Sequence, residues 1–175
     1  MTVVNKSIIL FLLLLVNLSA YESEDELKVI LTGKVAKFIT WQDNNSENRD
    51  KFVITVLRNP YTSLFDQKYK NKKIKDKDVV IKYIDDISKL SFTNILYIPK
   101  VNSVELETIL RVSSKKNILT ISSMRGFAQK GGAVQLFFIS QKGSLKINLD
   151  VLTKENFKVK SSFVRISEVV KGAVY

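Results

Sequence analysis

Four short runs of mostly apolar residues place the strongest constraint on the fold of this 175-residue chain. They span residues 52–57, 78–84, 94–98 and 117–122. The first run, Phe52-Val-Ile-Thr-Val-Leu57, is typical of a strand buried on both faces. Helical patterns or turns separate the runs, and strands that alternate with helices predict a mostly parallel sheet with helices on both faces.

The longest helical pattern lies near the N-terminus, between Glu24 and Trp41. Its apolar residues recur three and four positions apart, and acidic residues gather at its start, where the helix dipole favours negative charge. Similar patterns predict the other helical segments. These are a helix at 61–69, a turn or short helix at 85–90, a helix at 105–112 capped by Ser103, a helix at 151–156 capped by Asp150, and a last helix at 163–170 capped by Ser161 or Ser162.

Two further strands, at 133–139 and 144–149, are predicted to form a hairpin across Gln141-Lys142-Gly143. The chain is long enough for one domain with a real core, and it shows no internal repeat or linker. We therefore expect a single α/β domain with three layers. Its mostly parallel sheet would carry the C-terminal antiparallel hairpin at one edge and helices on both faces.

The N-terminus has the pattern of an export signal. Lys6 precedes an apolar run from Ile8 to Val16, and small residues follow, up to Ala20. The run is shorter than the roughly 20 residues that a transmembrane helix needs. We expect residues 1–20 to be a cleaved signal peptide and residues 21–175 to form the mature periplasmic domain, with a retained anchor as the alternative.

The composition excludes several kinds of chemistry. The chain has no histidine and no cysteine, so imidazole bases, thiol nucleophiles, disulfides and the usual zinc ligands are absent. Asp85 and Asp86 are sequence neighbours, and neighbouring side chains do not face one another as an acid and a base must. We expect a binding protein without a cofactor or metal, and no enzyme.

The net charge of +11 is large for a chain of this length. Removal of residues 1–20 takes away one charge, that of Lys6, and leaves 11 − 1 = +10. Nucleic-acid binding needs a concentrated basic face with stacking aromatics. The densest basic run, Lys68 to Lys75, is interpreted as a solvated connection between two elements, so no nucleic-acid partner is expected.

A loop with two glycines precedes the hairpin. Gly131 and Gly132 lack the spacing of a phosphate-binding loop and come before a strand, whereas a nucleotide site needs a helix N-terminus. The favoured interpretation is a tight turn, with Phe127 folded into the core and Asn148 making structural hydrogen bonds. The alternative is a ligand pocket lined by these four residues and Arg125.

The last helix carries more apolar residues than one buried stripe requires. Phe163, Val164 and Val169 alternate with Arg165 and Glu168, and apolar patches with charged rims often mark partner sites. We predict a partner-binding surface at these five residues. The alternative is a helix clamped between the sheet and the first helix.

Four stretches together give the chain a resemblance to the YfiR family (DUF4154). Their order and spacing carry the resemblance, which covers the chain from about Glu24 onward. The stretches are Ala36-Lys-Phe-Ile-Thr-Trp41; Ile118-Leu-Thr-Ile121 with Phe127-Ala128 and Gly131-Gly132; Ile147-Asn-Leu149; and Ser161-Ser-Phe-Val-Arg165.

The resemblance implies a periplasmic α/β regulator without enzymatic activity. Its expected partner is the periplasmic sensor region of an inner-membrane GGDEF-type diguanylate cyclase. Repression of that enzyme would lower cyclic di-GMP and restrain biofilm formation. The resemblance also implies an OmpA-like outer-membrane lipoprotein as a second partner and a homodimer as an option. This chain lacks the disulfides of the well-studied member, so redox control by that route is excluded. The alternative function is a periplasmic module that senses a small ligand or a cell-wall fragment without a cyclase partner.

Overall fold

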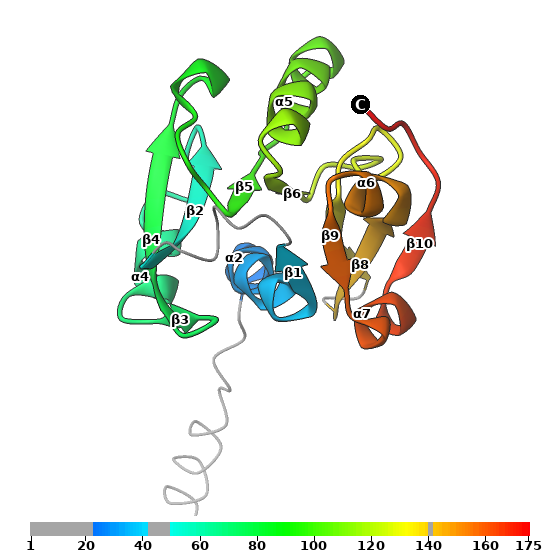
Figure 1. The fold of residues 1–175 in the computed structure, drawn as a ribbon. Coiled ribbons are helices and arrows are strands. Elements are labelled where there is room, and N and C mark those ends of the chain that lie inside the picture. The colour runs from blue at the N-terminus through cyan, green and yellow to red at the C-terminus, as the bar shows by residue number, and fades with distance from the viewer. Residues whose placement is uncertain (1–22, 42–49, 140–141) are drawn as a thin grey trace, which may run out of the picture.

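An eight-stranded sheet forms the centre of the computed structural model, which describes residues 23–41, 50–139 and 142–175 (Figure 1). The strand order across the sheet is β10-β8-β7-β6-β5-β2-β4-β3. The strands are β2 (Lys51–Leu57), β3 (Lys73–Ile74), β4 (Lys77–Ile84), β5 (Ile95–Tyr97), β6 (Leu119–Ser122), β7 (Val134–Ile139), β8 (Lys142–Asn148) and β10 (Glu168–Val170).

Five of these strands, β4, β2, β5, β6 and β7, run parallel to one another, as the alternating sequence pattern predicts. The expected antiparallel hairpin is formed by β7 and β8, and β3 adds a short antiparallel strand at the opposite edge. The hairpin itself does not end the sheet. Instead, β10 pairs in parallel with β8 and takes the edge position.

Helices cover both faces of the sheet, which gives the expected three layers. Helix α5 lies above the sheet in Figure 1 and α2 lies below it. The helices are α2 (Glu24–Val35), α4 (Leu64–Tyr69), α5 (Ser103–Lys115), α6 (Leu149–Lys154) and α7 (Ser161–Ile166). A capping box between Ser23 and Glu26 starts α2, so the acidic cluster does stand at the beginning of this helix.

Alternate residues of strand β5 serve two separate cores, because successive side chains of a strand point to opposite faces. Ile95 and Tyr97 of β5 join the core beneath α2, α4, α6 and α7, whereas Leu96 joins the core beneath α5. Leu106, Ile109 and Leu110 of α5 complete that second core. The central strands therefore need apolar residues on both faces, which explains their uninterrupted apolar runs.

The first helix is shorter than predicted. Helix α2 ends at Val35, a 3-10 turn, η1 (Ala36–Phe38), follows, and the chain then extends into β1 (Ile39–Trp41). This strand pairs antiparallel with β9 (Phe157–Val159) in a second, two-stranded sheet. The apolar spacing of Ile39 and Trp41 fits a strand as well as a helix, and a pairing partner more than 100 residues away decides between them.

The last helix is also shorter than predicted. It ends at Ile166, and the β-branched pair Val169-Val170 lies in β10, where residues 168–170 pair with 146–148 of β8. A neighbouring strand supplies backbone partners that local helical spacing cannot reveal. The hairpin strand β8 likewise begins at Lys142, so Lys142 and Gly143 belong to the strand and residue 141 lies outside the described residues.

Three predicted helix caps are wrong. Asn102 caps α5 in place of Ser103, and Asn148 caps α6 in place of Asp150. Lys160 precedes α7 and makes no side-chain capping bond, so neither Ser161 nor Ser162 has that role. In the first two cases the asparagine has the extended backbone that a cap requires, and the residue predicted as cap already lies within the helix. The predicted turn at 85–90 does contain a 3-10 helix, η2 (Ile87–Lys89).

The predicted signal peptide, residues 1–20, lies outside the described residues. Within the described part of the chain, no helix is both long and apolar enough to cross a membrane.

Candidate functional site

An exposed apolar surface lies where α7 meets β10. We define the C-terminal surface as Arg165, Ile166, Glu168 and Val169, together with Val164, which is partly buried against the core beneath α2. Ile166 is 62% exposed and Val169 is 46% exposed, although both are large aliphatic residues. Lys146 of β8 forms an ion pair with Glu168, with Nζ and Oε1 2.7 Å apart. Because β10 is an edge strand, its outer backbone groups also face outward.

The structure removes one predicted residue from this surface and adds another. Phe163 is fully buried and stacks on Phe38, with ring centroids 5.0 Å apart. Its side chain belongs to the core and is not available to a partner. Ile166 is the apolar residue of α7 that faces outward instead. The apolar surplus of this segment was visible in the sequence, but the prediction placed Phe163 on the exposed face and did not include Ile166.

The loop between β6 and β7 is packed with its own side chains. Phe127 is fully buried, and its ring lies directly against the backbone of Gly132. Gly131 has a positive φ of 94° and lies against Tyr175. The structure thus brings Phe127, Gly131 and Gly132 together but fills the space between them. Arg125 is exposed on the outside of the loop, so these residues do not form the ligand pocket considered from the sequence.

Asn148 has the structural role that its position between aliphatic residues suggested. The side chain is fully buried, and its Oδ1 accepts a hydrogen bond from the backbone N–H of Val151 at 3.1 Å. Its Nδ2 donates to the carbonyl oxygens of Ala128 at 3.0 Å and Ala173 at 3.3 Å. One amide therefore joins α6, the glycine loop and the C-terminal tail.

The connection after β2 leads to β4 on one side, and the connection after β5 leads to β6 on the other side. The carboxyl ends of β2 and β5 therefore mark the switch point of the sheet. Open α/β sheets commonly bind ligands in the crevice at such a point. Here Arg58 bridges it with a two-pronged ion pair to Glu105, at 2.6 and 3.2 Å. The Tyr61 and Tyr97 hydroxyls lie 2.6 Å apart nearby, and burial raises the pKa of Tyr97 well above its ordinary value. Arg58 and Glu105 therefore join the end of β2 to the start of α5, and the two tyrosine hydroxyls are hydrogen-bonded to each other.

Glu155, at the end of α6, is buried and has one carboxylate oxygen without a hydrogen-bond partner among the described residues. Burial raises the pKa of this carboxyl group from an ordinary 4.5 to about 7, and the Ser114 hydroxyl and the Lys154 charge oppose only part of that rise. The folded protein therefore keeps a proton on Glu155 at pH values where the unfolded chain has lost it.

We expect this proton to make the protein more stable in mild acid. The contribution is fully present below about pH 4.5 and is lost as the pH rises through about 7. Glu155→Gln should raise the free energy of unfolding by about 2 kcal/mol at pH 8 and much less at pH 5. Urea unfolding at both pH values measures this difference. Asp150→Asn changes an exposed residue of the same helix. In this control, the free energy of unfolding should differ between pH 8 and pH 5 by the same amount as in the parent protein.

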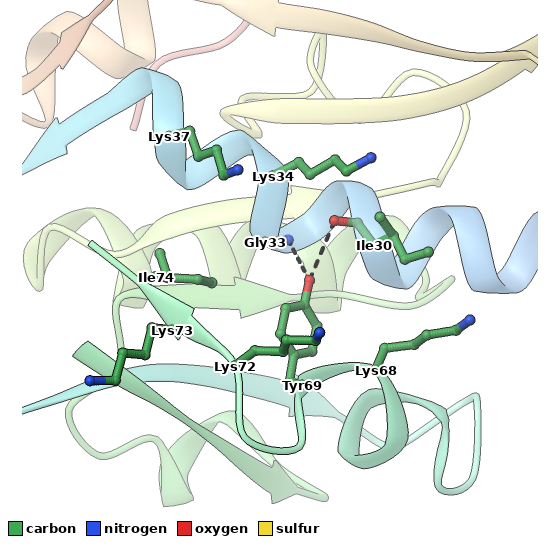
Figure 2. Close-up of a pocket in the computed structure, with 9 residues that line it drawn as sticks. All are labelled: Ile30, Gly33, Lys34, Lys37, Lys68, Tyr69, Lys72, Lys73 and Ile74. Atoms are coloured by element: carbon green, nitrogen blue, oxygen red, sulfur yellow. Dashed lines mark hydrogen bonds between the residues drawn. The ribbon is translucent and has the colours of Figure 1, made fainter. Parts of the chain in front are cut away.

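A cavity of about 300 Å³ opens between α2 and the segment that joins α4 to β3 (Figure 2). Ile30, Tyr69 and Ile74 supply its apolar surface, and Gly33 exposes backbone in its wall. The other side chains that line it are all lysines, which approach from both sides of the opening in Figure 2: Lys34, Lys37, Lys68, Lys72 and Lys73. The basic run at 68–75 is therefore more than a solvated connection, since it builds one wall of this cavity.

Tyr69 fixes the shape of the cavity by inserting its hydroxyl into α2. Its oxygen accepts a hydrogen bond from the N–H of Gly33 at 2.7 Å and donates to the carbonyl of Val29 at 2.7 Å. These are a donor and an acceptor that an α-helix ordinarily joins directly. Any side chain on residue 33 would collide with the tyrosine ring. The sequence offered no signal for this contact, because the two residues are 36 positions apart.

No group of three or more acidic side chains within the described residues could hold a metal ion. The two candidate binding sites are the C-terminal surface and the lysine-lined cavity. They lie toward different edges of the sheet (Figure 1). Both are arrangements for binding.

Two solved structures have a similar fold. One is CD0873 from Clostridium difficile, described as a substrate-binding protein with adhesive properties in its ligand-free, open form. It is 16% identical, covers 70% of this chain and has a TM-score of 0.51. The other is the ABC domain from Streptococcus pneumonia in complex with L-Trp, which is 10% identical, covers 82% of this chain and has a TM-score of 0.53. The chain spans 55% and 62% of their lengths, and at these identities the likeness shows the fold alone.

No curated protein matches the chain. A family model described as YfiR/HmsC-like, DUF4154, matches residues 25–168, which is most of the chain and includes the C-terminal surface up to Glu168. The chain belongs to the YfiR/HmsC-like family.

Proposed function

We propose that this chain is a periplasmic regulatory protein that captures the sensor region of an inner-membrane GGDEF-type diguanylate cyclase. Capture lowers cyclic di-GMP and so restrains biofilm formation, and an OmpA-like outer-membrane lipoprotein relieves it by competing for the regulator. Family membership supports the regulatory, non-enzymatic part of this proposal. Binding to the sensor region of the cyclase is the step that the Arg165→Glu/Val169→Asp variant tests.

The observation that carries the proposal is the C-terminal surface. Ile166 and Val169 expose aliphatic side chains between the charges of Arg165 and Glu168. An apolar centre with a charged rim is the usual composition of a protein–protein contact. The outer edge of β10 adds backbone donors and acceptors that a strand of a partner can use.

Binding at this surface can regulate a membrane enzyme without any chemistry. A regulator that binds the inactive arrangement of its partner more tightly than the active one shifts the population toward the inactive arrangement. The size of the shift is limited by the ratio of the two affinities. Capture of this kind is stoichiometric, with one regulator bound to each sensor region that it inhibits.

The double variant Arg165→Glu/Val169→Asp tests the surface. We expect it to weaken binding to the purified periplasmic region of the cyclase by at least about tenfold, because it places two negative charges in the apolar centre and rim of the contact. Titration calorimetry with the sensor region measures the affinity, and cyclic di-GMP measured in cells that carry the cyclase reports the consequence.

A matched variant controls for charge and hydropathy. Lys100→Glu/Val104→Asp makes the same two kinds of change at the start of α5, where Val104 is 79% exposed. We expect this control to bind as tightly as the parent. Equal binding by all three proteins would place the contact elsewhere, and no binding by the parent would reject the cyclase as the partner.

A further inference from the structure

The lysine-lined cavity between α2 and the α4–β3 segment has the chemistry of a ligand site that is separate from the C-terminal surface. Its inner surface is apolar, because the Tyr69 ring, Ile30 and Ile74 face it. Tyr69 and Ile74 are both nearly buried, so the floor is built from core residues with fixed positions. Such a floor favours the apolar part of a ligand over water.

The rim carries a strong positive charge. Five lysines line the opening, and every charged side chain among the described lining residues is a lysine. Among the described residues, only Lys68 has a close carboxylate partner, Glu26 at 3.1 Å, while Lys73 lies 4.0 Å from Asp78. Within the described residues, Lys34, Lys37 and Lys72 form no ion pair. Like charges gathered around an apolar floor repel one another, and a bound anion relieves that repulsion.

The size of the cavity limits the ligand. About 300 Å³ lies at the lower end of the range for small-molecule pockets, which begins at roughly 300 Å³. An apolar floor below a ring of ammonium groups suits a molecule with a short apolar body and one anionic head. Lysine side chains can follow such a head, since their flexible stems cover apolar surface while the charged ends remain in water.

We propose that this cavity binds a free amphipathic anion, with the apolar body on Tyr69, Ile30 and Ile74 and the anionic head among Lys34, Lys37 and Lys72. The hydroxyl of Tyr69 stays engaged with α2 and is not used for the ligand. Its ring and the adjacent Gly33 backbone form the surface against which the body rests. This inference stands on the cavity alone and does not require the proposed cyclase partner.

Octanoate is the probe for the test. Residues 21–175, the chain without the predicted signal peptide, are titrated with octanoate by calorimetry. We expect saturable binding of one octanoate per chain. Octylammonium has a similar apolar body with the opposite charge, and acetate has the charge without the body, so neither should bind at the same concentrations. In a nitrogen–proton spectrum the amide of Gly33 should shift with octanoate, whereas that of Gly172, in the C-terminal tail, should not.

Charge reversal identifies the lysines. Lys34→Glu/Lys72→Glu should weaken octanoate binding at least tenfold. The control variant, Lys100→Glu/Lys130→Glu, changes the net charge by the same amount at exposed lysines outside the cavity. It should bind octanoate as tightly as the parent protein. The proposal is overturned if octylammonium binds as well as octanoate, if both double variants behave alike, or if the chain binds phosphatidylglycerol vesicles but not octanoate. The last result would assign the lysines to a membrane surface.

Discussion

Gly132→Ala is expected to lower the free energy of unfolding by at least about 3 kcal/mol, at the upper end of the usual cost of overpacking a core. A Cβ on residue 132 would overlap three atoms of the Phe127 ring at distances that real Cβ atoms do not reach. The ring is fully buried in the core beneath α5 and has no free space to move into. Urea unfolding followed by circular dichroism measures the loss.

Gly126→Ala in the same loop separates this collision from backbone strain. Gly126 has a φ of 75° and nothing within 4 Å of the position a Cβ would take. Alanine there costs only the left-handed conformation, about 1 kcal/mol. If both variants lose the same stability, close packing of Phe127 on Gly132 is not what residue 132 provides.

Asn148→Ala is expected to cost about 2 kcal/mol, because one change removes two buried hydrogen bonds and one partly buried hydrogen bond. The N–H of Val151 loses its cap, which is worth about 1 kcal/mol. The carbonyl oxygens of Ala128 and Ala173 also lose the amide donor, at about 1 kcal/mol together, because Ala128 still accepts a hydrogen bond from the N–H of Gly131 and the bond to Ala173 is only partly buried. We also expect the C-terminal tail to become more accessible to proteolysis.

Asn102→Ala is the matched control, since Asn102 caps α5 through a 2.9 Å bond to the N–H of Glu105 and is exposed. It should cost about 1 kcal/mol, the value of a cap alone. The difference between the two variants measures the two carbonyl contacts. Equal losses would mean that the tail and the glycine loop do not depend on Asn148.

The positions of these residues show how far local patterns reach. Phe127 in the core and Asn148 as a structural hydrogen bonder were both expected from single residues among aliphatic neighbours, and both are confirmed. The alternative, a ligand pocket at the same loop, is not supported, because the Phe127 ring packs directly against Gly132. Local sequence indicates that a loop aromatic folds inward but not how much space it leaves.

At the candidate sites, too, local sequence predicted part of the arrangement and missed the rest. An apolar surplus at 163–170 predicted an exposed face, and such a face is present, yet Phe163 is buried and Ile166 is the exposed member. Helical spacing assumed one continuous helix, and the parallel pairing of β10 with β8 turned its second half into a strand. The lysine run predicted only a connection, because the opposite wall of the cavity, with Ile30, Gly33 and Lys34, comes from a separate helix that local sequence does not place beside it.

The sequence by itself determined the class of this protein. Uninterrupted apolar runs require strands buried on both faces and the intervening segments require helices, which together give an α/β domain. Only the tertiary structure decided which ends of those elements become strands, which aliphatic side chains remain exposed, and where five lysines meet an apolar floor. The physical reason is distance along the chain: side-chain periodicity acts over a few residues, whereas Tyr69 meets Gly33 across 36 positions and β1 meets β9 across more than 100.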